Sequence, residues 1–320
     1  MEFLIEEAES VERLLSRTVI VGGAGEVGRL IRRVLEPATM HIEIVDPELR
    51  TEGIDDRVTN SKADVMQWMH RQDSLLLSAD CVVLATPEEV ALPAVAPLAA
   101  RMPENALLVD TLSVKGPIVT QLRQVSGLEA LSLNPMFAPS LNLHGQPILA
   151  VEVAAGPRAA LFLDLFEAAG AQVTRCDTEE HDRATGTLQA LTHAALLSFG
   201  GALREIDGDV EQLLRIAPPP FVALLSLLSR LLAANPKTYL EIQSSNQAAK
   251  EARESLARGS RALDRVVDRG GPEFCQFLSS LSAVLGSEAP ELERQAQLLL
   301  ENVRRDCAPS VAGRSPSSSG

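Results

Sequence analysis

The sequence lacks the features that mark secreted and membrane-spanning proteins. Its four cysteines, at positions 81, 176, 275 and 307, are scattered without any pair at metal-ligand spacing, so neither a disulfide framework nor a metal site is expected. Nothing at the amino terminus resembles a secretion signal. No apolar run reaches the ~18 residues that span a bilayer. We therefore expect a cytoplasmic protein with free thiols and no bound metal.

Basic clusters are also missing. The 320 residues carry a net charge of −14, and adjacent basic residues form only short pairs such as Arg32-Arg33 and Arg304-Arg305. A chain this acidic repels the phosphates of nucleic acids and of anionic membranes, so we expect neither as a partner. An anionic substrate would need a few cations placed around it.

The segment from Thr18 to Asp46 carries the clearest pattern. A short apolar run leads into a glycine-rich turn, a stretch with helical spacing of apolar residues follows, and a second apolar run ends at Asp46. This order predicts a strand, a turn, a helix and a strand. Within it, Gly23, Gly25 and Gly28 form a G-x-G-x-x-G pattern in the context typical of a dinucleotide-binding fold.

Each glycine of this pattern has a steric reason: the turn itself, the approach of a pyrophosphate, and the packing of helix on strand. Glu26 and Val27 begin the helix, whose N–H groups would face the phosphates. Asp46 lies 18 residues after Gly28, where a carboxylate accepts hydrogen bonds from the adenosine ribose and repels a 2′-phosphate. We therefore predict NAD as the cofactor; the alternatives are an unrelated glycine-rich turn and an ordinary turn aspartate before Pro47.

Further strands and helices continue to about Asp177. The pattern predicts strands near 79–86, 107–110, 131–134, 147–153 and 172–175, helices over 63–77, 88–100 and 158–169, and an irregular polar segment over 47–62. Thr86 and Pro87 end one of these strands. Because ligands bind at the carboxyl ends of strands in such sheets, both residues are candidates for the wall of the cofactor site. They also suit the start of a helix, with Thr86 as the N-cap and Pro87 at the first helical position, and the two roles are compatible.

From Thr178 the pattern indicates helices only. Apolar periodicity predicts them from 179 to 197 and over 210–216, 221–234, 238–257, 261–269, 272–285 and 291–305. The predicted organisation is therefore an N-terminal helical extension (1–17), an α/β doubly wound domain of Rossmann type (18–177), an all-α substrate and dimerisation domain (178–307) and a disordered tail (308–320). We expect the helical domain to be shared between the subunits of a homodimer.

Five segments, in this order, resemble the prephenate dehydrogenase (cyclohexadienyl dehydrogenase) family. They are GGAGEVGRL, VVLATP, VDTLSVKGP, LNPMFAP and EEHDRATGTLQALTH, with weaker similarity through SRLLAANPKTYLEIQSSN. The resemblance implies an enzyme that oxidises a cyclohexadienyl ring carbon with NAD or NADP and removes the ring carboxylate, leaving an aromatic product. It also implies a dimer joined through the helical domain.

The same resemblance implies roles for single residues. Ser113 and Lys115 would lie near the substrate and the nicotinamide, His193 would be a polar active-site residue, and Tyr239 would lie near the substrate pocket. Arg230 would bind a substrate carboxylate. A guanidinium in a leucine-rich helix is costly to bury without such an anion, although at a helix edge it can instead extend into solvent. His193 by itself would more often be a core histidine.

One position departs from the family. Its members carry a histidine before Pro-Met-Phe that accepts the ring hydroxyl proton, and this chain has Asn134. An amide accepts and donates hydrogen bonds but cannot act as a base near neutral pH. General-base assistance contributes ~10²–10⁴ in rate, so an enzyme acting on a ring alcohol would be expected to lose much of its activity.

Three explanations are open. The ring can bear an amino group, as in 4-amino-4-deoxyprephenate, which would give 4-aminophenylpyruvate in an antibiotic-type pathway to 4-aminophenylalanine. Alternatively, the substrate is prephenate or arogenate and another base such as His193 or His181 serves it. In the third, the chain binds NAD without catalysis. We favour the first, because the lone pair of a neutral amine itself promotes hydride departure and Asn134 need only orient the nitrogen.

Overall fold

The computed structural model describes residues 15–50, 53–54, 57–71, 73–206 and 209–305. The predicted N-terminal helix falls almost wholly outside these ranges, as does the predicted tail. The chain divides into two compact units. The first comprises Met1–Gln189 with Lys237–Lys250, and the second comprises Ala190–Pro236 with Glu251–Gly320.

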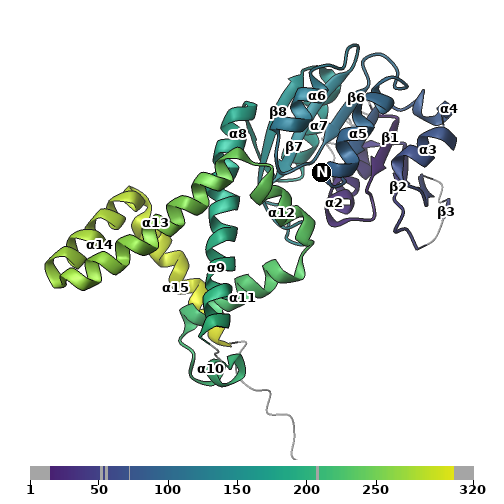
Figure 1. Cartoon of the computed structure of the whole chain (residues 1–320). Helices are drawn as coiled ribbons and strands as arrows, with labels where there is room; N and C mark the ends of the chain where they lie inside the picture. The colour runs from purple at the N-terminus through teal and green to yellow at the C-terminus, as the bar shows by residue number, and fades with distance from the viewer. Residues whose placement is uncertain (1–14, 51–52, 55–56, 72, 207–208, 306–320) are drawn as a thin grey trace, which may run out of the picture. The chain divides into compact units, whose positions relative to one another are not determined.

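The described part of the first unit is built on one nine-stranded sheet (Figure 1). Its strands are β1 (Arg17–Val21), β2 (His41–Val45), β3 (Gly53–Ile54), β4 (Val58–Ser61), β5 (Cys81–Leu84), β6 (Leu107–Asp110), β7 (Glu129–Pro135), β8 (Pro147–Ala154) and β9 (Gln172–Arg175). They lie in the order β3-β4-β2-β1-β5-β6-β7-β8-β9. The six from β4 to β7 are parallel, whereas β3 and β8 run antiparallel to β4 and β7. The parallel six have the 3-2-1-4-5-6 order of a doubly wound dinucleotide-binding sheet, which confirms the predicted fold class.

Helices cover both faces of this sheet, which explains why its central strands are apolar throughout. Val19 and Val21 of β1 belong to the core under one set of helices and Ile20 to the core under the other, because successive strand residues point to opposite faces. One face is covered by α3 (Val65–Arg71), α5 (Glu88–Ala99) and α6 (Gly116–Leu122), the other by α2 (Glu26–Leu35) and α7 (Pro157–Ala168). The unit also contains η1 (Glu36–Ala38), α4 (Asp73–Leu76) and α8 (Thr178–Thr185), and a π-helical turn, η2 (Gly186–Leu191), follows α8.

Two local predictions for this unit were wrong. The segment predicted to be irregular contains β3 and β4, and the helix predicted over 63–77 is two helices, α3 and α4. The sequence of β4 is Val-Thr-Asn-Ser, of which only Val58 is buried. A short strand near the sheet edge therefore showed no apolar alternation to identify it.

The segment 237–250 returns to the first unit. It contains most of α12 (Pro236–Ser244) and the start of α13 (Gln247–Arg269). Glu241 Oε1 accepts a hydrogen bond of 3.2 Å from the backbone N–H of Glu88, at the start of α5. Asn246 Nδ2 donates to the carbonyl oxygen of Asp182 (2.9 Å) and to Thr185 Oγ1 (3.0 Å) on α8. The helix predicted over 238–257 is therefore interrupted between α12 and α13, and α13 continues through the helix predicted separately over 261–269.

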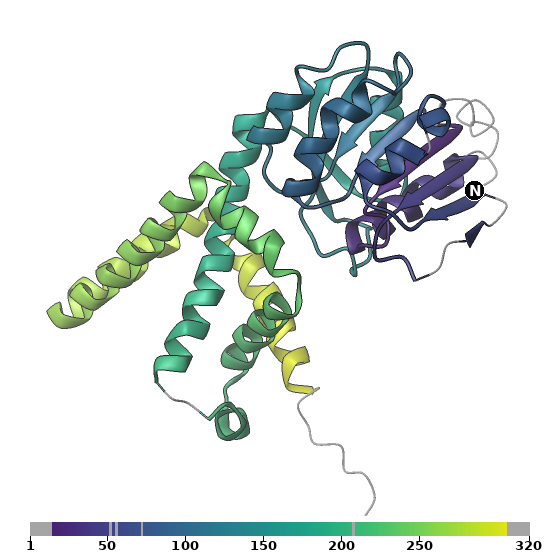
Figure 2. The same ribbon diagram turned by 45° about the vertical axis from the view of Figure 1, so that its right-hand side comes forward.

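The described residues of the second unit are helical (Figure 2). They form α9 (Thr192–Glu205), α10 (Val210–Ile216), α11 (Pro219–Ala233), most of α13, α14 (Gly271–Leu285), η3 (Gly286–Glu288) and α15 (Ala289–Arg305). Helix α11 packs on α9 and α15. A Cβ at Gly200 of α9 would lie 2.9 Å from Leu228 Cδ2, so this glycine lets the two helices approach. None of the described helices combines the length and apolar character needed to cross a membrane.

A buried ion pair joins the ends of β6 and β7. The fully buried Lys115 donates from Nζ to Asp110 Oδ1 at 3.0 Å and to the carbonyl oxygen of Leu133 at 2.9 Å. Asp110, equally buried, also accepts from the backbone N–H of Leu112 (3.0 Å) and from the hydroxyl of Ser132. Because a buried charge is costly unless it is paired and hydrogen-bonded, each member of this cluster depends on the others.

Lys115→Met should destabilise the fold, because it leaves the Asp110 carboxylate buried without a cation. We expect a loss of about 3–5 kcal/mol in the free energy of unfolding, measured by urea denaturation. The double variant Asp110→Asn/Lys115→Met should recover most of the loss, since no charge remains uncompensated. Lys237→Met, which removes a solvent-exposed ion pair with Glu89, is the control and should leave stability nearly unchanged. Equal losses in the single and double variants would contradict this account.

Candidate active site

The predicted site residues of the first unit lie at the carboxyl edge of the parallel strands. The glycine-rich turn follows β1 and Asp46 follows β2. Thr86 lies just beyond β5, Ser113 follows β6, and Asn134 is near the end of β7. The strand order reverses between β1 and β5, and ligands bind outside the carboxyl ends at such a reversal.

The glycine-rich turn is closely packed on its inner side. Gly22 has a φ of +80°, and a Cβ there would lie 2.2 Å from the carbonyl oxygen of Ala85, next to the end of β5. Cβ atoms at Gly23 and Gly28 would lie 2.6 Å from Ile44 and 2.3 Å from the carbonyl oxygen of Gly22. A Cβ at Gly25 would meet only that same oxygen, at 3.2 Å, so its outer side is open. This is the arrangement in which a pyrophosphate can approach the backbone.

Two further features fit a dinucleotide. The N-terminus of α2, where Glu26 and Val27 lie, has no side-chain cap, so its first N–H groups suit a phosphate. Asp46 is 7% exposed and accepts hydrogen bonds from the backbone N–H groups of Ala24 (3.0 Å) and Glu48 (2.8 Å). A carboxylate has about four acceptor positions, so both oxygens can still accept from ribose hydroxyls.

Thr86 and Pro87 lie beside this turn. Thr86 Oγ1 is buried and has no hydrogen-bond partner among the described residues. A buried hydroxyl without a partner costs free energy, and a ligand at this edge would remove that cost. Pro87 is the N-cap residue of α5 and Glu88 is its first helical residue, so the helix begins one residue later than these two roles predict.

Asn134 belongs to a chain of buried polar contacts. Its side chain is 2% exposed, and its Nδ2 lies 3.0 Å from Nε2 of the fully buried His181. His181 Nδ1 in turn lies 2.8 Å from Asp182 Oδ1. Asp182 also accepts hydrogen bonds from the backbone N–H groups of Lys115 (2.9 Å) and Gly116 (3.0 Å).

The protonation states in this chain follow from its surroundings. Burial lowers the pKa of His181 despite the opposing hydrogen bond to Asp182, so the ring is neutral near pH 7. Burial alone would raise the pKa of Asp182, but the hydrogen bonds from His181, Lys115 and Gly116 outweigh it and lower that pKa. A carboxylate only accepts, so His181 Nδ1 carries the hydrogen and Nε2 accepts from Asn134 Nδ2. His181 is therefore not placed to serve as the replacement base for a ring hydroxyl.

Lys115 is held inside the fold. Its ammonium is in the cluster with Asp110, and burial lowers its pKa against the opposing effect of that carboxylate. Its side chain donates to the carbonyl of Leu133, the neighbour of Asn134, and its backbone N–H donates to Asp182. These contacts tie Lys115 to the position of Asn134, which the sequence did not reveal. Its predicted place near the substrate and the nicotinamide stays a prediction.

The other predicted residues are divided between the units. Ser113 is half-buried in the loop between β6 and α6, and Tyr239 is half-buried on α12 in the first unit. His193 is half-buried on α9 in the second unit, where burial lowers its pKa. Arg230 is exposed on α11 of the second unit, so the argument from its burial finds no support in the single chain. The roles of these four residues stay predictions.

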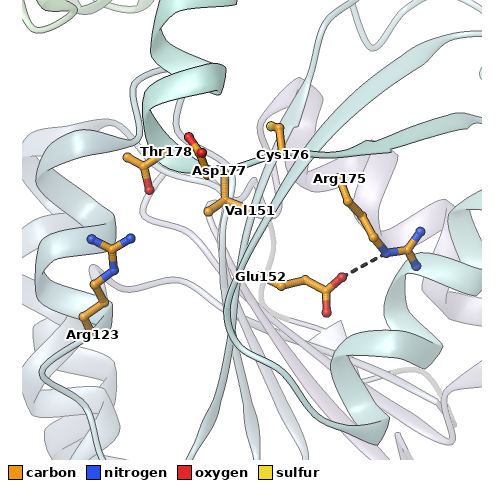
Figure 3. Close-up of a pocket in the computed structure, with 7 residues that line it drawn as sticks. All are labelled: Arg123, Val151, Glu152, Arg175, Cys176, Asp177 and Thr178. Carbon is orange, nitrogen blue, oxygen red and sulfur yellow. Dashed lines mark hydrogen bonds and ion pairs between the residues drawn. The ribbon is translucent and has the colours of Figure 1, made fainter.

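The first unit also has a surface pocket of about 350 Å³ (Figure 3). It is lined by Arg123, Val151, Glu152, Arg175, Cys176, Asp177 and Thr178. Arg175 pairs with Glu152 at 2.9 Å, and Asp177 caps α8 by accepting from the backbone N–H of Glu180. Arg175, Glu152 and Asp177 are thus already engaged in contacts of the fold, and none of the predicted site residues lines the pocket.

Comparison with known proteins assigns the chain to a family. Residues 47–143 match the family described as "Prephenate dehydrogenase, nucleotide-binding domain", and residues 177–281 match "Prephenate dehydrogenase, dimerization domain". A 4-amino-4-deoxyprephenate dehydrogenase of Streptomyces pristinaespiralis is 42% identical over 283 residues, covering 88% of this chain and 95% of that protein. A "Probable arogenate/prephenate dehydrogenase" of Methanocaldococcus jannaschii is 25% identical and covers 84% of this chain and 61% of that protein.

A solved structure shows the same fold. The crystal structure of prephenate dehydrogenase from A. aeolicus, in complex with hydroxyphenyl propionate and NAD+, superposes with a TM-score of 0.68 at 19% identity. The match covers 84% of this chain and 96% of that one. Sequence segments, fold and comparisons agree, and the chain belongs to the prephenate dehydrogenase family.

Proposed function

We propose that this protein catalyses the NAD-dependent oxidative decarboxylation of 4-amino-4-deoxyprephenate to 4-aminophenylpyruvate, on an antibiotic-type route to 4-aminophenylalanine. The observation that carries the proposal is Asn134, which stands near the end of β7 where the resemblance places a histidine base. The relative of 42% identity, named for this amino substrate, supports it. Family membership alone would fit a hydroxyl substrate equally well.

The chemistry suits an amide at this position. The C4–H bond of the ring breaks with both electrons leaving as hydride, which NAD accepts. The bond to the ring carboxylate breaks to release carbon dioxide, and its electrons complete the aromatic ring. A neutral amine at C4 stabilises the developing positive charge with its own lone pair, so no proton need leave the nitrogen during hydride departure. Asn134 Oδ1 can accept one N–H and hold the nitrogen in place.

A hydroxyl substrate would make a demand that Asn134 does not meet. The ring oxygen must lose its proton as the hydride departs, and an amide cannot take it. His181 Nε2 is occupied by Asn134, which leaves His193 as the candidate base for prephenate or arogenate. A cofactor-binding homologue without activity is the third possibility. Against it stands the presence of Ser113, Lys115, His193 and Arg230, which binding alone would not need.

The predicted roles of single residues are part of the proposal. Gly23, Gly25 and Gly28 hold the pyrophosphate, Asp46 holds the adenosine ribose, and Thr86 and Pro87 form part of the cofactor wall. Ser113 lies near the reacting ring, with Tyr239 near the substrate. His193 is a polar active-site residue, and Arg230 is the cation for a substrate carboxylate. The free thiols Cys81, Cys176 and Cys275 agree with action in the cytoplasm.

The protein is proposed to act as a homodimer. Residues 190–236 and 251–281 of its second unit lie within the match to the family's dimerization domain. Helices of this unit carry large apolar side chains that are exposed in the single chain, among them Leu227, Leu232, Leu281 and Val284. Exposed apolar residues in such number are typical of a surface that another subunit covers.

The substrate assay tests the proposed function directly. The purified protein is supplied with NAD and either 4-amino-4-deoxyprephenate or prephenate, and reduced cofactor is followed by absorbance. We expect kcat/KM to be at least ~10²-fold higher for the amine, the lower bound of general-base assistance. NADP should replace NAD poorly because Asp46 repels a 2′-phosphate. Preference for prephenate would reject the proposal, and NAD binding without turnover of either compound would favour the inactive homologue.

Asn134→His should create activity toward prephenate. It restores an imidazole at the position of the missing base in an otherwise similar pocket, so we expect prephenate turnover to rise about tenfold or more. The matched control is Asn134→Gln, which keeps an amide and should gain no prephenate activity. A histidine variant that folds and binds NAD but stays inactive on prephenate would show that pocket shape, not the base, excludes this substrate.

Solution mass and substitution together test the dimer. Light scattering should give twice the 34.3 kDa mass of one chain. The double variant Leu281→Glu/Val284→Glu places charges on the exposed apolar side of α14 and should shift the protein toward monomers. Leu77→Glu, at a comparably exposed leucine of the first unit, should leave the mass unchanged. A monomeric wild-type protein would reject the assembly.

A further inference from the structure

We propose that His181 is a positioning residue that fixes which end of the Asn134 amide faces the substrate, and that it thereby adapts the site to an amine. The inference rests on the proposed function and identifies the contact that orients the Asn134 amide toward an amine. It follows from the order of donors and acceptors between Asp182 and Asn134.

An asparagine side chain fits its site in two orientations that exchange the carbonyl and the NH₂ group. At this site the choice is made by His181 Nε2, 3.0 Å from Asn134 Nδ2. Because Asp182 holds the hydrogen of His181 on Nδ1, Nε2 is an acceptor and must meet the NH₂ group. The carbonyl oxygen Oδ1 is then directed to the other side. No described residue donates a hydrogen bond to it, so it can accept an N–H of the substrate.

The orientation matters for the electrons of the reaction. A primary amine that donates one N–H to Oδ1 keeps its lone pair, which must feed the ring as the hydride leaves. With the amide reversed, the NH₂ group of Asn134 would donate a hydrogen bond to that lone pair and withdraw it from the ring. One orientation thus assists the reaction and the other opposes it.

Protonation of His181 should reverse the amide. A hydrogen on Nε2 would face the NH₂ group of Asn134, and two donors at this distance repel until the amide turns over. The charged groups around the ring are Asp182 on the same helix, Asp110 at the end of β6 and Lys115 in the following loop. Asn246 of the 237–250 segment, which contacts the Asp182 carbonyl, carries no charge. Since burial lowers the pKa of His181, the reversal should occur below the ordinary range of histidine.

The first measurement needs no substrate. Nitrogen-15 NMR of the full chain, with its five histidines labelled, reports which ring nitrogen carries the hydrogen and at what pH each ring becomes charged. The His181 signal is assigned by its loss in His181→Gln or, should that variant not fold, by its coupling to Asn134. We expect a neutral Nδ1–H ring at pH 7.5. A neutral Nε2–H ring would overturn the proposal, because it would require the reversed amide.

The second measurement is kcat/KM for 4-amino-4-deoxyprephenate against pH with saturating NAD, which reports groups that titrate before the substrate binds. In the wild type we expect one acid limb with the midpoint that NMR gives for His181, in addition to the limb that the ammonium form of the substrate itself produces. His41→Gln, an exposed histidine at the start of β2, should keep this profile. His181→Gln cannot change charge, so the limb at the His181 midpoint should disappear while the limb of the substrate remains. Its kcat at pH 7.5 should fall about tenfold with KM for NAD unchanged, because a glutamine can present either end to Asn134.

An acid limb at the His181 midpoint that persists in His181→Gln would overturn the proposal. A wild-type profile without a limb at the NMR midpoint of His181 would also do so, and this comparison does not depend on the variant folding. Absence of amine turnover in the wild type would reject the proposed function and the adaptation to an amine with it. The NMR measurement of which His181 nitrogen carries the hydrogen is made without substrate. It therefore tests the orientation of the Asn134 amide even if the proposed substrate is wrong.

Discussion

The buried ammonium of Lys115 is the contact on which the arrangement at the sheet edge depends. A charge without access to water must be paired by the chain, and here Asp110 and the carbonyl of Leu133 do so. The same residue supplies a backbone N–H to Asp182, which holds His181, which in turn holds Asn134. These contacts form a closed ring, because Leu133, whose carbonyl accepts from Lys115, directly precedes Asn134 in the chain. The buried Lys115 is therefore linked to the position of the Asn134 amide both through its side chain and through its backbone.

This network explains why the residue types at the site cannot be interpreted one at a time. Considered alone, Asn134 indicates that the histidine base of the family is missing, and His181 is a candidate to replace it. Together they form a donor and an acceptor that satisfy each other in a site closed to water. The neutral ring and the amide satisfy each other, and Asn134 keeps its carbonyl oxygen as an acceptor and one amide hydrogen as a donor. Asn134 can therefore orient the nitrogen of an amine.

The predictions that succeeded rested on patterns among residues close together in the sequence. The glycine-rich turn, Asp46 and the central strands were placed correctly because their signals lie within a few residues of chain. Strand β4 was missed because it is short and mostly polar, and the break before α13 was missed because Asn246 bonds to α8, some sixty residues earlier. The burial of Lys115 could not be foreseen for the same reason: its partners come from β6, β7 and the start of α8. Contacts between segments that are distant in the sequence leave no pattern in the residues nearby.

The return of 237–250 to the sheet has a consequence for how the protein can be divided. The backbone passes from one unit to the other after Gln189, after Pro236 and again after Lys250. Neither unit is therefore a contiguous module that recombination could transfer by a single crossover. A gene fragment ending at Gln189 would encode a sheet whose helix α5 has lost Glu241 from its first turn. Separation of the two units would therefore require three breaks in the chain.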